Sequence, residues 1–591
     1  MTKRPGPWIA LLVVAMLGQA TRPLYPVMYE LGEDWDFVAA GLVALGVAAA
    51  PILGSIAGPL RDEVAVRVGT VALGAAWVVP ALVAEPPTWM AIAAPALAGA
   101  GAGLALTRLG TTGRLGRFPA LPVVGGLALD TLARVPTYNW DLVWTGWWVV
   151  PAVVAAALFV LAALPDDGRG PPVRVRFWFA LGPFLALHLL FVQNAAAVAA
   201  QSGVAFAVAA SVVLLGGALA VAGATLGGRQ VPVFVAGLVG AGALWLLPSS
   251  SGVEPIVLVL LAALCLGVLL GGAGAGTGSP GRLRPLVAMA GGSVVGLALV
   301  LVWALDIDSP LPFPRALLLV VGVACVAGAA FGGKPAANTP VMVGVAGLAA
   351  AAVLVVLFAG PMVPTTTEPD EGTRIVSLNA RGAVGPGGFL RPDRILDSLA
   401  GADVIVLQEV ARGWPIHGTL DLLSYVADGL GMEAAFAPAA DPQFGNAVLT
   451  RLPMQVVDSG ILPADGSQAR SYLWVEVETA SGPLQVVATH LHSRSTSQIE
   501  AVLGLGAPTP LVLAGDMNVA PGDPEVALFE AAGLVDVVGA TGDACRTTSA
   551  EPTRPCDRPD WVFVSGDVRF GEVAIGTATA SDHLPISVRV R

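Results

Sequence analysis

Charged residues are scarce in this chain: only 12% of its 591 residues are Asp, Glu, Lys or Arg, whereas 55% are hydrophobic. An ordinary soluble protein carries about 25% charged residues. The scarcity excludes a soluble enzyme with one globular core, a disordered chain and a nucleic-acid scaffold. It is also uneven, since residues 1–360 hold 17 basic and 14 acidic residues while residues 361–591 hold 14 and 28. We therefore expect a membrane domain (1–360) followed by an acidic, soluble domain.

Cysteine is rare as well, with four residues in the whole chain. Cys265 and Cys325 stand singly in apolar stretches, where a cysteine usually packs as a small hydrophobic residue. Cys545 and Cys556 share a polar segment with no histidine or second cysteine pair nearby, which disfavours a zinc site. If that segment lies outside the cytoplasm, we expect the two to form a disulfide.

Long apolar stretches are what the first 360 residues have in abundance. Each is long enough, or nearly so, to cross a hydrocarbon core of about 30 Å as a helix. No A-x-A site follows the first stretch, so we expect no cleaved signal peptide. The thirteen stretches run over residues 8–24, 37–60, 68–84, 89–106, 118–133, 145–164, 177–200, 204–225, 231–247, 256–270, 286–305, 316–331 and 341–358.

Basic residues between these stretches predict the orientation, because cytoplasmic loops are enriched in Lys and Arg. With the N-terminus inside, three basic residues fall on or near the outer side, namely Arg22, Arg134 and Arg315, and the other fourteen of this region fall inside. Thirteen crossings then place everything after Phe358 outside the cytoplasmic membrane. We expect a multi-pass membrane protein with its soluble domain outside the cell membrane.

Two features of the membrane domain leave alternatives open. The loop GPLRDEVAVR (58–67) resembles the loop signature of major facilitator transporters, or is a tight, positive-inside turn. Arg22, Asp130, Arg134 and His188 are ionisable residues inside apolar stretches, and such residues are costly there. They form either a polar pocket for a headgroup or solute, or a structural Asp130–Arg134 ion pair with a histidine hydrogen-bonded between helices.

A short linker rich in Pro, Thr and acidic residues follows (361–372). Beyond it the sequence pattern changes to short β-like runs separated by polar loops. Helical segments are expected at 392–399 and 524–532. Many strands with interspersed helices over residues 373–591 predict a two-sheet α/β sandwich. The expected strands lie at 374–378, 404–407, 447–450, 472–477, 484–489, 511–514, 561–564 and 586–590.

Polar residues follow these runs in seven ordered motifs, and we expect exposed strand ends to gather them at one face. The motifs are SLNAR (377–381), LQEV (407–410), GNAVLTR (445–451), THLHS (489–493), GDMN (515–518), PDWVF (559–563) and SDHLP (581–585). Together they resemble the endonuclease/exonuclease/phosphatase superfamily, which includes deoxyribonuclease I-like enzymes and neutral sphingomyelinases. The resemblance covers essentially all of residues 373–591.

The resemblance and the residue chemistry imply a magnesium-dependent phosphoric ester hydrolase, with Mn²⁺ as an alternative cation. Glu409 is the expected metal ligand, helped by Asn379 and Asp582, because Mg²⁺ prefers carboxylate and other oxygen donors. Asp516 is the expected base that removes a proton from the attacking water, and Asn518 is expected to hold the phosphate. His490 and His583 are expected to donate hydrogen bonds to phosphoryl oxygens, with Asp560 as the partner of His583. The expected substrate contacts are Arg381, Asn446 and His492. Arg381 departs from relatives that carry an acidic residue there. His492 and His417 are alternatively solvated loop residues.

The motifs do not choose the substrate, because one fold serves many. A net charge of −14 over residues 361–591 disfavours nucleic acid, whose binding rests on Lys and Arg. A tether to the membrane raises the concentration of the domain near headgroups, and proteins that remodel the lipid of GPI anchors resemble this chain in arrangement. We expect a phospholipid, glycolipid or lipid-linked phosphoester substrate. The alternatives are an extracytoplasmic nuclease and a transporter with a non-catalytic hydrolase-like domain.

Overall fold

The computed structural model divides the chain into two compact units, one ending at Gly360 and the other beginning at Pro361. The last predicted membrane stretch, 341–358, and all of the sequence-predicted linker except Gly372 lie outside the described residues. The structure describes residues 5–34, 37–83, 86–146, 149–164, 170–227, 229–278, 281–306, 311–332, 372–385, 388–550, 552, 556–577 and 581–591.

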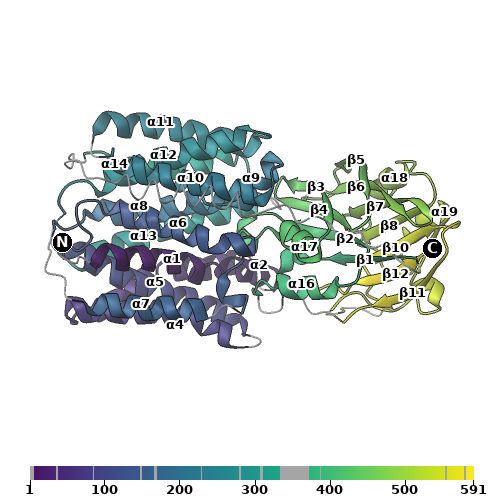
Figure 1. The fold of residues 1–591 in the computed structure, drawn as a ribbon, viewed down its shortest axis with the longest axis horizontal. Helices are drawn as coiled ribbons and strands as arrows, with labels where there is room; N and C mark the ends of the chain where they lie inside the picture. The colour runs from purple at the N-terminus through teal and green to yellow at the C-terminus, as the bar shows by residue number, and fades with distance from the viewer. Residues whose placement is uncertain are drawn as a thin grey trace. The chain divides into compact units, whose positions relative to one another are not determined.

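The described residues of the N-terminal unit form helices, and the long helices run alongside one another (Figure 1). Small residues let the helices approach closely: a Cβ added to Gly69 would lie 2.5 Å from the carbonyl oxygen of Gly101, and one added to Gly101 would lie 2.6 Å from that of Gly69. The helices are α1 (Gly6–Thr21), α2 (Leu24–Asp34), α3 (Phe37–Ala48), η1 (Ala50–Ala57), α4 (Asp62–Val78), η2 (Pro80–Leu82), α5 (Thr88–Thr111), α6 (Ala120–Arg134), η3 (Val135–Thr137), η4 (Leu142–Trp144), α7 (Val149–Ala163), α8 (Val175–Leu187), the π-helix η5 (His188–Val192), α9 (Ala195–Ser202), α10 (Phe206–Ala224), α11 (Gln230–Leu246), η6 (Leu247–Ser249), α12 (Glu254–Gly274), α13 (Leu283–Leu305) and α14 (Ala316–Ala330).

Nine helical segments among the described residues are long and apolar enough to cross a membrane, or ten if one bent pair counts as a span. This is consistent with a multi-pass membrane protein, but the predicted count of thirteen is not confirmed. Two of the predicted stretches, 118–133 and 145–164, correspond to a pair of segments bent by 81°, and α14 is shorter than a full span. The orientation stays a prediction.

The loop that resembles the transporter signature begins a helix, since Asp62 is the first residue of α4. Its carboxylate accepts hydrogen bonds from Arg108 at 3.2 Å and from Arg282 at 3.1 Å. The loop is therefore held by arginines from two other helices, which fits both interpretations of its sequence.

The C-terminal unit is a sandwich of two six-stranded sheets, as the sequence predicts. The first sheet has the order β11-β12-β1-β2-β4-β3 and the second β5-β6-β7-β8-β10-β9, and α17 lies against the first sheet in Figure 1. The strands are β1 (Thr373–Asn379), β2 (Val404–Ala411), β3 (Glu433–Asp441), β4 (Phe444–Thr450), β5 (Met454–Ile461), β6 (Ser471–Thr479), β7 (Gly482–His490), β8 (Leu511–Asp516), β9 (Leu534–Asp536), β10 (Asp560–Ser565), β11 (Phe570–Ile575) and β12 (Ile586–Val590), and the helices are α16 (Pro392–Ser398), α17 (Leu422–Leu430), α18 (Thr496–Leu503) and α19 (Val526–Ala531).

Apolar side chains from both sheets form the core between them, because alternate residues of a strand point to opposite faces. A second cluster covers the outer face of the second sheet, where Ile499 of α18 and Phe529 of α19 pack with Phe563 of β10. Every predicted strand and both predicted helices are confirmed. The sequence analysis missed β3, β5, β9, β11, α17 and α18.

Candidate active site

Strand pairing brings the predicted polar residues to one edge of the sandwich. In the second sheet β7 and β8 are parallel, with His490 opposite Asp516, and β10 is antiparallel to β8, with Asp560 opposite Asp516. The prediction that each motif residue ends its strand is therefore wrong for Asp560, which begins β10, and for Asn446, which lies near the start of β4. It is also wrong for Asp582 and His583, which precede β12. An antiparallel strand reaches the same edge with its first residues.

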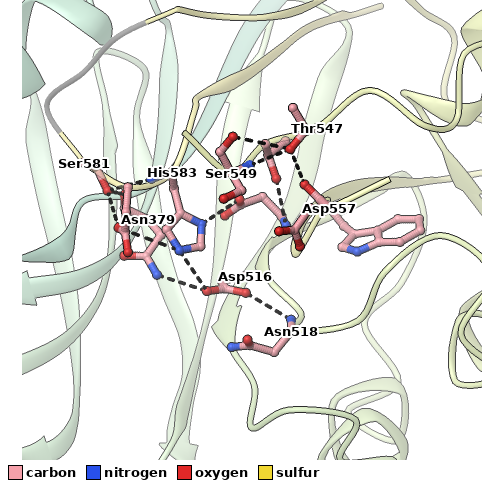
Figure 2. A network of polar contacts seen from close by, with 12 residues as sticks. Asn379, Asp516, Asn518, Thr547, Ser549, Asp557, Ser581 and His583 are labelled. Atoms are coloured by element: carbon pink, nitrogen blue, oxygen red, sulfur yellow. Dashed lines mark hydrogen bonds and ion pairs between the residues drawn. The ribbon is translucent and has the colours of Figure 1, made fainter. Parts of the chain in front are cut away.

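Asp516 is the centre of this cluster, and it is buried rather than exposed, with 2% of its surface accessible. The side-chain amide of Asn379 donates to Asp516 Oδ2 at 3.0 Å and to Glu409 Oε1 at 3.2 Å, while the backbone N–H of Asn518 donates to Asp516 Oδ1 at 3.0 Å (Figure 2). Burial raises the pKa of Asp516 to about 6. The carboxylate is thus oriented by two fixed donors and is a stronger base than a solvated aspartate.

The expected pairing of His583 with Asp560 is present, with His583 Nδ1 2.7 Å from Asp560 Oδ2. Burial by itself would lower the pKa of His583, but the carboxylates of Asp560, Asp516 and Asp582 outweigh it and hold that pKa well above its usual value. Both ring nitrogens therefore carry protons near neutral pH. The Nε2 proton faces the site, where Nε2 lies 3.9 Å from Asp516 Oδ2.

His490 has the opposite character, since burial and the positive charges of Arg470 and His583 hold its pKa well below the usual value. Arg470 Nη1 lies 3.0 Å from His490 Nδ1. Because a guanidinium has only N–H donors, we infer that Nδ1 accepts and that Nε2 carries the proton of the neutral ring. That nitrogen lies 3.4 Å from Asp516 Oδ2.

Sequence analysis missed Arg470. It directly precedes β6, which is antiparallel to β7, the strand that ends in His490. The position of Arg470, directly before a strand that pairs with the strand ending in His490, would have predicted a contact between the two side chains. Asn446 is buried and donates to the carbonyl oxygen of Ser471 at 2.9 Å, so it holds the strand beside Arg470.

Glu409 lies within β2, and burial together with the carboxylate of Asp582 raises its pKa to about 6, against the opposing effects of Arg470 and His583. Its backbone φ is 53°, and that of Asn518 is 50°. Non-glycine residues adopt this left-handed region rarely, and those that do often lie at functional sites.

The remaining predicted contacts surround this centre. Arg381 donates its backbone N–H to Asn379 Oδ1 at 3.0 Å, and its Nε lies 3.5 Å from Asp582 Oδ2. The side-chain amide of Asn518 donates to the carbonyl oxygen of Leu491 at 3.0 Å, next to the ring of His490. His492 is partly exposed, and its backbone N–H donates to Gln498 at 2.7 Å.

His417 is not a solvated loop residue, because it is 2% exposed and stacked on the ring of Trp414. A Cβ on Gly382 would collide with its ring. The sequence analysis failed here because the loop folds inward onto an aromatic core.

Cys545 and Cys556 form a disulfide, as predicted. The segment between them supports the histidine loop, since Ala550 N–H donates to the carbonyl oxygen of Asp582 at 2.7 Å and Leu584 N–H to that of Thr548 at 2.6 Å. Figure 2 shows Thr547 and Ser549 of this segment beside His583. The disulfide therefore closes a segment that borders His583.

Residues 376–583 match the Endonuclease/Exonuclease/phosphatase family. Three solved structures show similarity. The endonuclease/exonuclease/phosphatase of Beutenbergia cavernae is 23% identical, with a TM-score of 0.32, over 37% of this chain and 72% of that one. The mannosyl-6-phosphatase of Bacteroides thetaiotaomicron is 20% identical, with a TM-score of 0.29, over 37% of this chain and 99% of that one. TDP2 of D. rerio, complexed with single strand DNA product, is 22% identical, with a TM-score of 0.31, over 38% of this chain and 100% of that one. No curated protein matches the chain.

Proposed function

Because residues 376–583 form an endonuclease/exonuclease/phosphatase domain, we propose that the chain is a membrane-anchored, metal-dependent phosphoesterase. Members of this superfamily are mostly hydrolases of phosphoesters. The observation that carries the proposal is the convergence of Glu409, Asp516 and the His583–Asp560 pair on one edge of the sandwich.

Asp516 is the proposed general base that removes a proton from the attacking water. Its carboxylate is held by Asn379 and by the backbone of Asn518, and a base whose pKa is near the working pH is the most effective. The protonated Nε2 of His583 and the Nε2–H of His490 donate to the phosphoryl oxygens, where negative charge develops in the transition state.

The donor set fits a hard divalent cation such as Mg²⁺ or Mn²⁺. Burial and, next to it, the charge of the neighbouring Asp582 carboxylate raise the pKa of Glu409. These two carboxylates would hold the cation together with Asn379 Oδ1. When bound, the cation neutralises phosphoryl charge. Donor atoms of Asp516, Asp560 and His583 also lie within 4.8 Å of one another and form a second candidate donor set for the cation.

The proposed substrate is a phospholipid, glycolipid or lipid-linked phosphate. The domain continues a chain that has at least nine apolar helices long enough to span a membrane, which keeps it near lipid headgroups. Its net charge of −14 over residues 361–591 disfavours a polyanion. An outward orientation is supported by the basic bias of the predicted inner loops and by the Cys545–Cys556 disulfide.

The test is hydrolysis by the purified full-length protein in nanodiscs with Mg²⁺. The panel contains a total lipid extract, plasmid DNA and soluble phosphomonoesters, with products identified by mass spectrometry and Asp516→Asn as the inactive control. Release of a headgroup or phosphate from lipid supports the proposal. Cleavage of DNA alone would replace it with the nuclease, and no cleavage of any substrate would favour the transporter with a non-catalytic domain.

A further inference from the structure

Three interrupted helical segments of the N-terminal unit meet at one place. The first is broken at Arg22 and Pro23 between α1 and α2, the second after Arg134 at the end of α6, and the third at Gln193 and Asn194 between η5 and α9. Non-helical backbone at membrane depth is tolerated only where it is buried in protein or lines a polar cavity. Broken helices at such depth often build binding sites.

An ionic cluster joins the three breaks, and we define it by Arg22, Asp130, Arg134, Asp141 and Gln193. Arg22 donates to both oxygens of Asp130 and, at 2.9 Å, to Asp141. Arg134 and Gln193 donate to Asp130 Oδ2 at 3.3 and 3.1 Å. His188 takes no part in these bonds, because its Nδ1 lies 2.9 Å from the carbonyl oxygen of Phe184, one turn earlier.

Two buried polar atoms at the C-terminal end of α1, one of Arg22 and one of Gln19, have no hydrogen-bond partner among the described residues. They are Arg22 Nε, a donor, and Gln19 Oε1, an acceptor one helical turn earlier, on residues that are 5% and 4% exposed. Gly18 lets α1 pack closely against these groups, since a Cβ there would lie 3.2 Å from Arg22 Nη2 and 3.4 Å from Asp130 Oδ2. Buried polar groups are nearly always paired, so an unpaired donor and acceptor side by side indicate a missing partner.

We propose that this cluster is a binding site for an oxyanion that also carries a hydroxyl group, either free phosphate or the phosphate and hydroxyls of a lipid headgroup. The guanidinium fork of Arg22 matches oxyanion geometry, and its unpaired Nε needs an acceptor. The unpaired Gln19 Oε1 needs a donor, which a phosphate or headgroup hydroxyl supplies and a carboxylate does not.

Charge balance identifies the residue that the ligand displaces. The two arginines and two aspartates of the cluster sum to zero, so an added anion must replace one carboxylate. Asp141 is the more accessible of the two, at 7% exposed against 1% for Asp130, and it makes one bond to Arg22. Asp130 is held by four side chains, those of Arg22, Arg134, Gln193 and Gln19. Displacement of Asp141 leaves one net positive charge for the ligand.

The experiment measures binding of inorganic phosphate, sulfate and phosphatidylglycerol vesicles to the full-length protein in EDTA. Sulfate matches phosphate in shape but has no hydroxyl at neutral pH. The wild type should bind phosphate or phosphatidylglycerol saturably and prefer phosphate to sulfate. Gln19→Leu should remove that preference, a change of roughly 3- to 10-fold for one hydrogen bond, Arg22→Gln should abolish binding, and Asp141→Asn should strengthen it.

Arg114→Gln is the matched control, because Arg114 also pairs with one carboxylate, Glu63, but lies outside the cluster. It should bind like the wild type. Binding of phosphate alone identifies free anion, and binding of the vesicles alone identifies a headgroup. No saturable binding by the wild type, or unchanged binding and preference in both Arg22→Gln and Gln19→Leu, overturns the proposal. All variants should keep the hydrolysis of the proposed function, so failure of either proposal is recognised separately.

Discussion

At the scale of single residues, Asp516 and Glu409 have separable roles. Asp516→Asn keeps the size and an acceptor for the Asn518 N–H but removes the base, so turnover should fall by about 10² to 10⁴ while metal affinity changes little. Glu409→Gln should instead raise the concentration of Mg²⁺ that half-maximal activity requires. Titration of activity with Mg²⁺ in EDTA-treated protein measures both. Wild-type turnover by Asp516→Asn would exclude it as the base.

Arg470 is a positioning residue, because it acts through the ring of His490. The Arg470 guanidinium lies 3.0 Å from His490 Nδ1, and its positive charge adds to the effect of burial on the histidine pKa. Without this charge the pKa of His490 rises, and the ring protonates at higher pH. Arg470→Gln should therefore shift the acidic limb of the pH–rate profile upward and lower turnover. Arg412→Gln is the control, since Arg412 pairs with Asp421 elsewhere in the domain; an identical profile for both variants would leave Arg470 with no such role.

His417 predicts a pH-dependent stability. Burial, and secondarily the charge of Arg381, lowers its pKa to about 3, while the unfolded value is about 6.5. The folded domain therefore holds the neutral ring, and the stability this contributes is complete above pH 6.5 and is lost as the pH falls toward 3. The loss can reach roughly 3 to 5 kcal/mol.

His417→Phe keeps the stack on Trp414 and removes the titration. Hydrogen exchange of β2 and β4, corrected for the intrinsic exchange rate at each pH, should show wild-type opening becoming easier between pH 6.5 and 4. The variant should show a weaker dependence. Equal pH dependence in both proteins would contradict the assignment.

At the scale of elements, the segment between Cys545 and Cys556 is hydrogen-bonded to the loop that carries His583. A disulfide of sequence separation 11 typically stabilises by about 2 to 4 kcal/mol, and this one closes the segment that pairs with Asp582 and Leu584. The Cys545→Ser/Cys556→Ser double variant should have a lower thermal stability and a lower turnover, because the backbone bonds of this segment to Asp582 and Leu584 hold His583 between them in place. Activity and melting temperature with and without reductant measure it; full activity after reduction of the wild type would show that the segment positions itself without the bond.

At the scale of the whole molecule, the basic bias of the loops predicts that the hydrolase domain faces outward. A reporter fused after Arg591 that works only outside the cytoplasm should be active, and one that works only inside should be silent. The reverse pattern would place the domain in the cytoplasm. The same fusion at Arg229, in a predicted inner loop, should give the opposite result and serves as the control.

The sequence alone predicted the apolar helical region and the two-sheet sandwich, and it named the polar residues that the structure gathers at one edge of that sandwich. The length of an apolar stretch and the spacing of apolar residues are local properties of the sequence. Apolar helices and strands can therefore be predicted without knowledge of the tertiary structure. The same holds for Asn379, Glu409, His490, Asp516 and His583, because each lies in a motif tied to a strand. The number of crossings was not readable, since the sequence does not reveal where a helix bends, as between α6 and α7.

Only the tertiary structure decided which residues act through others. Arg470 belongs to no motif, and it reaches His490 because β6 runs antiparallel to β7. Asp560 begins its strand and still meets Asp516, and His417 is buried because its loop packs against Trp414. In the membrane unit, Gln19 and Gln193 join Asp130 although they are far apart in the chain. Strand direction and helix packing bring such residues together, and these depend on contacts between distant segments that no local pattern encodes.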